Sequence, residues 1–318
     1  MVDAVVPGAD VDLAVREFGG RGTPLLLLHG AGNTLVDMAP LAGHLVADHR
    51  VVGMDFRNHG WSGDGPWEWE KVVADIRAVI DQLGLTKPII VGHSLGGIVA
   101  AMYGQRFGGI AAAINLDGHG DGNAQQPGRD AADLLRLRTL LRAAGDVQVR
   151  ELGRPRTESE IASARAAWVA GALSLGLESA LAAEAFDRKL VGSDHGTFTL
   201  RPCSARLLEL RTAIEDLDVL SVYSESSVPQ LVYVAVRDQP DPTLSSELQN
   251  LAAAQRRGLR SQLQHLSQRR PNVQVIEIEA THGLIYECPE LIASQIRDFI
   301  NGLEQPTAGV GFSFGEQR

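Results

Sequence analysis

Short apolar runs alternate along this chain with longer segments whose apolar residues recur at helical spacing. A continuous run such as Leu25–Leu28 is typical of a strand that is buried on both faces of a sheet. A segment such as 67–83 repeats its apolar residues every three or four positions, as an amphipathic helix does. The predicted strands are 2–6, 11–18, 25–28, 50–54, 89–91, 110–116, 230–236 and 273–278. The predicted helices are 37–47, 67–83, 95–107, 130–144, 158–188, 203–214, 245–269 and 289–303.

This alternation predicts an α/β fold with a mostly parallel central sheet flanked by helices. It is interrupted once, because residues 118–227 carry mostly helical patterns and no clear strand. We therefore expect a core formed by 1–117 and 228–304, with the inserted segment, 118–227, as a helical lid. The lid is expected over the carboxyl ends of the strands, where such sheets bind ligands. Residues 305–318 are rich in glycine and polar residues and are predicted to form a flexible tail.

The most informative local pattern is Gly-His-Ser-Leu-Gly at residues 92–96, which lies between the apolar run 88–91 and the helix-like run 97–103. Strand, sharp turn and helix together are the context of a nucleophile elbow, which lifts a serine oxygen above the sheet. Glycines on both sides leave room for the strained turn. The pattern predicts Ser94 as a nucleophile; the alternative is an ordinary turn before a helix.

A serine hydroxyl is a weak nucleophile, so it needs a base to take its proton and an acid to orient that base. His282 is the best candidate for the base, because it directly follows the last predicted strand. Two aspartates are candidates for the acid. Asp238 follows the preceding strand and gives the chain order serine, aspartate, histidine that is expected of this architecture, so we prefer it. Asp117, at the end of an earlier strand, is the alternative.

Cleavage of a carbonyl bond places negative charge on the carbonyl oxygen, and backbone N–H groups must already point at that position. The N–H of Leu95 follows the nucleophile, and Ala31 in the turn after strand 25–28 is expected to supply the second donor. Asn33 is either a substrate contact or a cap for the helix that begins near residue 37. The candidate substrate contacts are Asn33, His93 and Trp61.

Several motifs of the chain resemble those of the α/β-hydrolase superfamily. Residues 55–62, Asp-Phe-Arg-Asn-His-Gly-Trp-Ser, are similar to the family's D-x-R-G-H-G-x-S turn. Residues 282–289 resemble its H-x-x-x-x-E-x-P segment around the catalytic histidine. The chain departs from the family at Asn58, where glycine is usual, and around Asp238, where the common G-x-x-D form is missing. The resemblance covers the core and leaves the inserted segment unmatched.

The elbow residue separates the branches of this superfamily. The core motifs are also similar to the epoxide hydrolase and haloperoxidase-like branch, but epoxide hydrolases and haloalkane dehalogenases use aspartate at the elbow, where this chain has Ser94. The resemblance therefore implies a serine hydrolase that cleaves an ester, lactone or thioester of a small to medium organic substrate through an acyl-enzyme. The alternatives are a non-hydrolytic enzyme of the same fold (a perhydrolase, lyase, cyclase or acyltransferase) and a lid-gated, non-catalytic binding protein.

Composition narrows the choice of partners. The chain has 318 residues, a formal net charge of −10 and a pI near 5.4, which argues against nucleic acid and anionic membranes. Neither a secretory signal nor an apolar stretch of the ~20 residues needed to span a membrane is expected. The two cysteines are far apart in the sequence and show no metal-ligand spacing, so we expect no bound metal. The chain also has no dinucleotide or phosphate fingerprint, so we expect no organic cofactor. We expect a cytoplasmic protein that acts on a small molecule as a monomer or homodimer.

Overall fold

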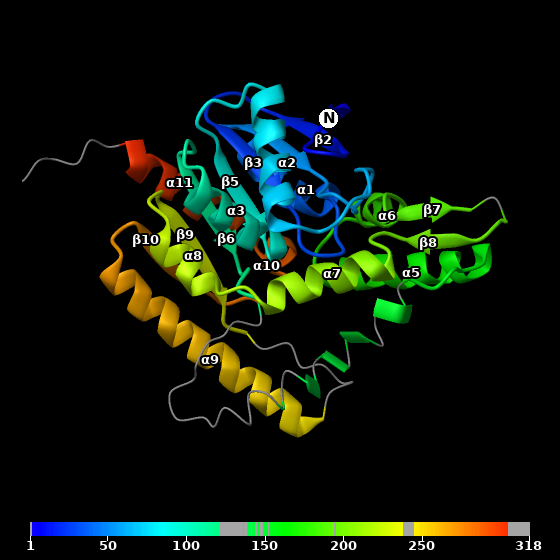
Figure 1. The fold of residues 1–318 in the computed structure, drawn as a ribbon. Coiled ribbons are helices and arrows are strands. Elements are labelled where there is room, and N and C mark those ends of the chain that lie inside the picture. Colours follow the sequence, from blue (N-terminus) through cyan, green and yellow to red (C-terminus); the bar gives the residue numbers. More distant parts are fainter. Residues whose placement is uncertain are drawn as a thin grey trace, which may run out of the picture.

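The fold is described from a computed structural model (Figure 1). The structure describes residues 2–120, 153–193, 195–237 and 245–304, together with residues 136, 139–140, 142–143, 145–146 and 149–151. Much of the predicted helix 130–144 therefore lies outside the described residues. Asp238 and the predicted tail 305–318 lie wholly outside them.

Eight strands form one sheet in the order β1-β2-β4-β3-β5-β6-β9-β10. The pairs β1–β2 and β2–β4 are antiparallel, and every other neighbouring pair is parallel. This confirms the predicted fold class and the predicted strands of the core. The strands are β1 (Val2–Pro7), β2 (Asp12–Gly19), β3 (Pro24–Leu28), β4 (Arg50–Met54), β5 (Ile89–His93), β6 (Ala112–Leu116), β9 (Gln230–Ala235) and β10 (Val273–Ile278).

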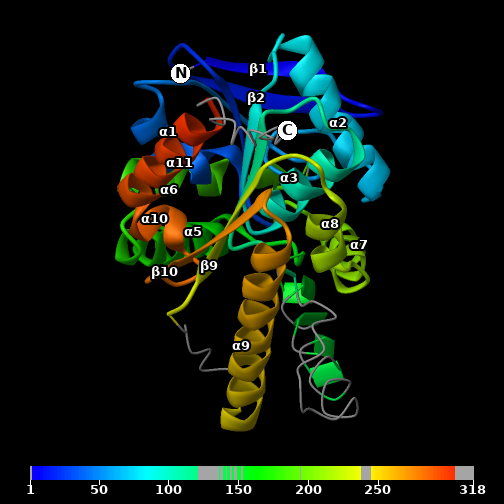
Figure 2. The same ribbon diagram turned by 90° about the vertical axis from the view of Figure 1, so that its left-hand side faces the viewer.

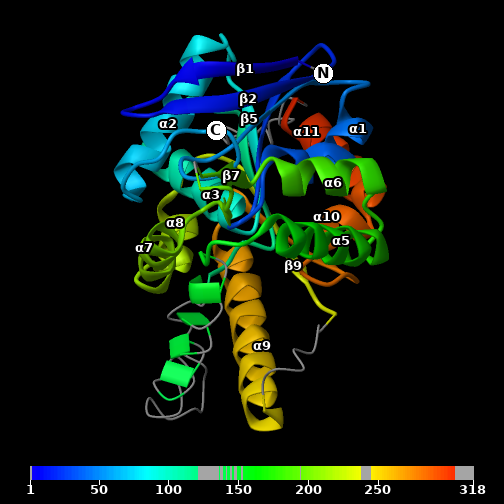
Figure 3. The same ribbon diagram turned by 90° about the vertical axis from the view of Figure 1, so that its right-hand side faces the viewer.

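Helices cover both faces of the sheet. Figures 2 and 3 show α1, α10 and α11 on one face and α2, α3 and α8 on the other. None of the described helices is both long and apolar enough to cross a membrane. The helices are η1 (Leu35–Met38), α1 (Ala39–Leu45), α2 (Trp69–Gln82), α3 (Leu95–Arg106), α5 (Glu158–Ser174), α6 (Ser179–Asp187), α7 (Ser204–Glu215), α8 (Val219–Glu225), α9 (Ser246–Arg269), α10 (Leu284–Glu287) and α11 (Pro289–Glu304).

The run 25–28 in β3 shows why continuous apolar stretches mark the central strands. Leu26 and Leu28 belong to the apolar cluster beneath α2 and α3, whereas Leu25 and Leu27 belong to the cluster beneath α1 and α11. All four side chains are fully buried. Successive residues of a strand point to opposite faces, so a strand covered on both sides needs apolar residues at every position.

The segment between β6 and β9 contains a feature that the sequence analysis did not predict. Besides α5, α6, α7 and α8 it forms an antiparallel hairpin of β7 (Leu190–Gly192) and β8 (Phe198–Leu200). The expectation of no strand in the inserted segment is therefore wrong at this point. Each strand has only three residues, which is too short for an alternating pattern to stand out. Figures 1 and 3 show α5, α6 and the hairpin beside the edge of the sheet where the parallel strands end.

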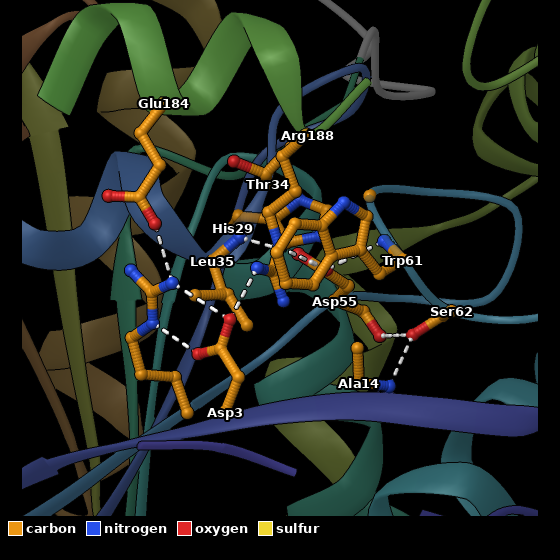
Figure 4. Close-up of polar contacts among 12 residues, drawn as sticks. Asp3, Ala14, His29, Thr34, Leu35, Asp55, Trp61, Ser62, Glu184 and Arg188 are labelled. Carbon is orange, nitrogen blue, oxygen red and sulfur yellow. Dashed lines mark hydrogen bonds and ion pairs between the residues drawn. The ribbon is translucent and has the colours of Figure 1, made fainter. Parts of the chain in front are cut away.

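Arg188, directly after α6, ties the inserted segment to the core (Figure 4). Its Nε donates a hydrogen bond to Asp55 Oδ2 over 2.6 Å, and both side chains are fully buried. Its Nη1 donates to Asp3 Oδ2 over 2.8 Å, and the guanidinium lies 3.9 Å from the ring centre of Trp61. The pair joins the turn after β4 to the end of α6, elements far apart in the sequence.

A second arginine strengthens this connection. Arg16 of β2 contacts both Asp3 Oδ1 and Glu184 Oε1 of α6 at 2.5 Å. The hydrogen bond from Arg16, opposed by partial burial and helped by Arg188, lowers the pKa of Asp3 to about 2. Asp3 therefore stays ionised at neutral pH and holds both guanidinium groups in place.

Substitution of Arg188 by methionine is expected to destabilise the protein by about 3–5 kcal/mol, because it leaves the Asp55 carboxylate buried without its charged partner. The matched control is Arg165→Met in the same segment, which breaks the exposed Arg165–Asp187 pair and is expected to cost less than about 1 kcal/mol. Urea unfolding curves of the two variants test this difference. Equal losses of stability would contradict a special role for the buried pair.

Candidate active site

Ser94 occupies a sharp turn between β5 and α3. Its backbone angles, φ 53° and ψ −117°, are strained for a residue with a side chain. A Cβ on Gly92 would lie 2.0 Å from the carbonyl of Gly96, and a Cβ on Gly96 would lie 2.3 Å from the backbone oxygen of Leu28. The two flanking glycines are therefore required by close approach of the backbone, as the motif implies.

The loops after β10 and β6 bring an imidazole and a carboxylate together. His282 Nδ1–H donates a hydrogen bond to Asp117 Oδ2 over 2.7 Å. The other oxygen of Asp117 accepts from the backbone N–H of Ala235 over 2.9 Å. This geometry gives the alternative acid a direct contact with the candidate base, whereas the preferred acid, Asp238, lies outside the described residues.

Asp117 is held by the loop that carries it. Its backbone adopts φ 58°, and the side chain of Asn115 bonds both the N–H and the carbonyl of the next residue, Gly118, at 2.6 and 2.7 Å. Burial raises the pKa of Asp117, but the hydrogen bond from His282 and the charge of His119 outweigh it, so the pKa lies below its ordinary value. The carboxylate is therefore ionised at neutral pH and can orient an imidazole.

His93 is a candidate substrate contact in the sequence analysis, but it lies beneath the loop of His282. It is buried, its Nε2–H donates to the backbone carbonyl of His282 over 2.8 Å, and the two rings lie 4.9 Å apart. Burial and the neighbouring His282 lower the pKa of His93 to about 4, so this imidazole is neutral. His93 therefore supports the loop of the candidate base. The described residues that line the cavity beside Ser94 include neither of two candidate substrate contacts, His93 and Trp61.

Residues 30–33 lie beside Ser94, and they are here called the oxyanion turn because the sequence analysis predicts Ala31 as an oxyanion donor. The N–H of Asn33 closes the turn on Gly30 O over 3.1 Å, and the N–H of Gly32 donates to His59 Nε2 over 3.1 Å. Ala31, Asn33 and the elbow residue Leu95 line the cavity. Leu95 is the first residue of α3, so its N–H has no acceptor within the helix.

Two buried histidines support the oxyanion turn. His29 Nε2 accepts from the N–H of Phe56 over 3.1 Å, and its Nδ1–H donates to Gly30 O over 2.7 Å. Burial is the main cause that lowers the pKa of both His29 and His59, so both rings are neutral. Each ring joins a backbone group of the oxyanion turn to the segment after β4, which holds the turn in position.

The other interpretation of Asn33, as a helix cap, is wrong. Thr34 occupies the cap of η1, where its N–H and hydroxyl both contact Asp37 Oδ2, at 2.7 and 3.0 Å. Asp37 Oδ1 in turn accepts from the hydroxyl of Tyr286 over 2.7 Å. The side chain of Asn33 is therefore not needed for the cap and remains a candidate substrate contact.

A cavity of about 950 Å³ joins these groups. Ser94, His282 and Asp117 line it from the core, and the inserted segment and α9 supply the opposite walls. The volume is in the range of pockets that bind small organic molecules. Lining residues from the inserted segment include Trp168, Phe186, Leu200 and Leu210.

Sequence reasoning missed the cations that line this cavity, among them the pair Lys189 and Arg201. They are neighbours at the base of the hairpin, where Arg201 N–H donates to Lys189 O over 2.9 Å. Residues 192–196 contain turn residues that favour a hairpin, but the flanking apolar runs are too short to predict the two strands that place both cations side by side. In the part of the chain that the structure describes, no three His, Cys, Asp or Glu side chains form a group that could hold a metal ion.

Comparisons with known proteins agree with this architecture. The model of the alpha/beta hydrolase family matches residues 25–296. The chain is 33% identical over 103 residues to the sn-1-specific diacylglycerol lipase ABHD11 of Danio rerio, which covers 31% of this chain and 32% of that protein. It is 34% identical over 78 residues to esterase YbfF of Escherichia coli (24% and 31% covered), and 36% identical over 88 residues to epoxide hydrolase 4 of Mus musculus (26% and 24% covered). The matches thus span about a third of these relatives or less.

Solved structures show the same fold over nearly the whole chain. The structure of E-2-(acetamidomethylene)succinate hydrolase aligns with a TM-score of 0.69 at 20% identity and covers 94% of this chain and 99% of that one. The thioesterase domain from the curacin biosynthetic pathway aligns with a TM-score of 0.61 at 17% identity, with 93% and 99% covered. At these identities the likeness concerns the fold alone.

Proposed function

The chain belongs to the alpha/beta hydrolase family, and from this premise we propose that it is a serine hydrolase that cleaves an ester, lactone or thioester of a small to medium organic molecule. The proposal rests on one observation above all: His282, hydrogen-bonded to Asp117, lines the same cavity as Ser94 at the strained turn. A positioned imidazole with an orienting carboxylate is the arrangement that activates a serine.

In the first half of the proposed reaction, Ser94 Oγ attacks the substrate carbonyl while Nε2 of His282 takes the hydroxyl proton. Asp117 holds the Nδ1–H of the same ring and stabilises the imidazolium that forms. The negative charge on the carbonyl oxygen is received by the N–H groups of Leu95 and Ala31. The bond to the leaving group then breaks, the leaving group takes the proton from His282, and an acyl ester of Ser94 remains.

In the second half, water attacks the acyl carbonyl and gives a proton to Nε2 of His282. The bond between the acyl group and Ser94 Oγ breaks, and the proton passes from His282 back to Ser94. The same two N–H groups stabilise the charge of this second tetrahedral intermediate. We assign the orienting role to Asp117, because its carboxylate occupies the Nδ1 side of His282. One base and one acid then serve both half-reactions.

The identity of the nucleophile argues for acyl chemistry over epoxide opening. Within this architecture, epoxide opening through an alkyl-enzyme ester needs a carboxylate at the elbow, and this chain has the hydroxyl of Ser94 there. The esterase and the lipase among the similar proteins support an ester substrate. A cytoplasmic location and a monomeric or homodimeric state stay predictions from the sequence.

A fluorophosphonate probe should label the folded protein, because its phosphorus reacts with an activated serine and the adduct resembles the tetrahedral intermediate. Intact-mass spectrometry should show one adduct, and peptide mapping should place it on Ser94. The Ser94→Ala variant is the control and should stay unlabelled. Unlabelled folded wild-type protein, or equal labelling of the variant, would overturn the proposal.

A further inference from the structure

Lys189 is a buried cation in the wall of the cavity. It lies directly after Arg188, at the base of the β7–β8 hairpin, and is only 5% exposed. Its Nζ lies 3.6 Å from the centre of the Trp168 ring, so the aromatic face supplies one favourable contact. An aromatic face compensates only part of the cost of taking an ammonium group out of water.

No carboxylate of the described residues pairs with Lys189. The two acidic side chains that influence it most are already engaged: Asp55 bonds Arg188 and two backbone N–H groups, and Asp37 bonds Thr34 and Tyr286. Burial therefore prevails over these two carboxylates and lowers the pKa of Lys189. Lys189 thus lines the cavity without a carboxylate partner among the described residues.

The neighbouring cation, Arg201, does have a carboxylate partner. Arg201 Nη1 donates to the backbone oxygen of Gly60 over 2.7 Å, and its Nη2 pairs with Asp64. Its charge is therefore already balanced from outside the cavity. Of the two cations at the base of the hairpin, Lys189 is the one whose charge the described protein leaves uncompensated.

Basic residues predominate among the charged side chains that line the cavity. Among the described residues that line it, Asp117 is the single carboxylate, and that group is taken up by His282. This contrasts with the net charge of −10 of the chain. Three of the lining cations pair with carboxylates that do not line the cavity: Arg201 with Asp64, Arg211 with Asp146 and Arg260 with Glu277. We therefore assign the attraction for an anionic ligand mainly to Lys189. The lining cations are Lys189, Arg201, Arg211, Arg256, Arg257 and Arg260.

Lys189 and residues 31–33 of the oxyanion turn line the same cavity. After burial and His29, the charges of Arg201 and Lys189 further lower the pKa of His59. His59 in turn accepts the N–H of Gly32 in the oxyanion turn. Because Lys189 shares this cavity with Ser94 and Leu95, a molecule whose anionic group binds Lys189 can also reach the carbonyl-binding site.

We infer that Lys189 binds a free carboxylate of the substrate, so that the enzyme acts on molecules that carry a carboxylate in addition to the bond that is cleaved. A carboxylate fits better than a phosphate monoester, because one ammonium group balances one negative charge. This inference rests on the proposed function of Ser94 for its catalytic meaning. The binding step itself does not require catalysis, and the two can be tested apart.

Binding is measured first, on the Ser94→Ala variant, by isothermal titration with monomethyl adipate and with methyl hexanoate. Both probes carry the same ester and chain length, and only the first ends in a carboxylate. We expect monomethyl adipate to bind about 10- to 100-fold more tightly, as a charge-assisted hydrogen bond allows. Lys189→Met in the same background should abolish the difference, and Lys189→Arg should keep most of it.

Turnover is measured next, with the mono-4-nitrophenyl ester of adipic acid and with 4-nitrophenyl hexanoate. Lys189→Met should lower kcat/KM for the charged ester about 10- to 100-fold, mainly through KM, and change the neutral ester little. Arg154→Met is the matched control, because Arg154 is an exposed cation of the inserted segment that pairs with Glu160 and does not line the cavity. It should leave both esters unchanged.

The two proposals fail in different ways. Equal binding of the two methyl esters to Ser94→Ala, or an equal effect of Lys189→Met on both, would overturn the carboxylate site. A preserved preference in binding without turnover of any ester would leave the carboxylate site standing and overturn the hydrolase. Thermal unfolding of each variant identifies any that is not folded, and Lys189→Arg then provides the comparison within folded protein.

Discussion

Replacement of Ser94 by alanine is expected to lower kcat for a 4-nitrophenyl ester by about 10⁶-fold, which is the order of loss seen when the nucleophile of a serine enzyme is removed. The variant has no oxygen that can form the acyl-enzyme, so water would have to attack directly. The N–H groups of Leu95 and Ala31 would remain and would still stabilise the charged carbonyl oxygen. Stopped assays at high enzyme concentration should therefore detect a small residual rate above the buffer rate.

The same variant should fold normally. Alanine meets the same backbone strain at φ 53° as serine does, and the flanking Gly92 and Gly96 are unchanged. The thermal unfolding midpoint should match that of the wild-type protein. If a folded Ser94→Ala variant kept more than about one hundredth of wild-type kcat, the assigned nucleophile would be wrong.

The sequence predicted the core because burial imposes a pattern that can be read locally. Strands covered on both faces, such as 25–28, must be apolar throughout, and the elbow at Ser94 cannot form without close-packed glycines. His282 could be selected for a similar reason, since its loop directly follows the last strand. These features depend on a few consecutive residues, so one sequence is sufficient to propose them.

The choice between the two candidate acids depends on their three-dimensional distance from His282, which no short stretch of sequence reveals. Asp117 and Asp238 both follow a strand of the same parallel sheet, and β6 and β9 are neighbours in it. The sequence does contain Asn115 and Gly118 on either side of Asp117. In the structure these two residues are hydrogen-bonded to each other, and Asp117 between them adopts φ 58°. Such a left-handed residue, followed by glycine, indicates a loop with one required geometry and not an ordinary turn.

The inserted segment was the least predictable part for a further reason. Apolar residues of α8 such as Val222 and Tyr223 pack on the core, but the contact near α6 also depends on single long side chains such as Arg188 on Asp55. No periodic pattern in the sequence predicts which of the many arginines will be buried. Lys189 is hidden for the same reason, because its uncompensated charge appears only when Trp168 and the cavity are placed around it.

The second large effect on activity is expected from substitution of the orienting acid. Substitution of Asp117 by asparagine is expected to lower kcat/KM by about 10⁴-fold, because an amide cannot stabilise the imidazolium and can favour the wrong tautomer of His282. Asp238→Asn is the matched comparison, since it makes the same chemical change at the acid that the sequence favoured. It should reduce kcat/KM by less than about 10-fold if Asp117 is the orienting group.

The pair of variants decides the assignment, because each outcome implies a different partner for His282. In the structure, Asp117 Oδ2 already accepts the Nδ1–H of His282 over 2.7 Å, and the second oxygen is held by Ala235. A second carboxylate could take over only by displacing this contact. A large loss from Asp238→Asn with a small one from Asp117→Asn would therefore mean that the loops rearrange when substrate binds. Equal, large losses would mean that both carboxylates act on the same imidazole.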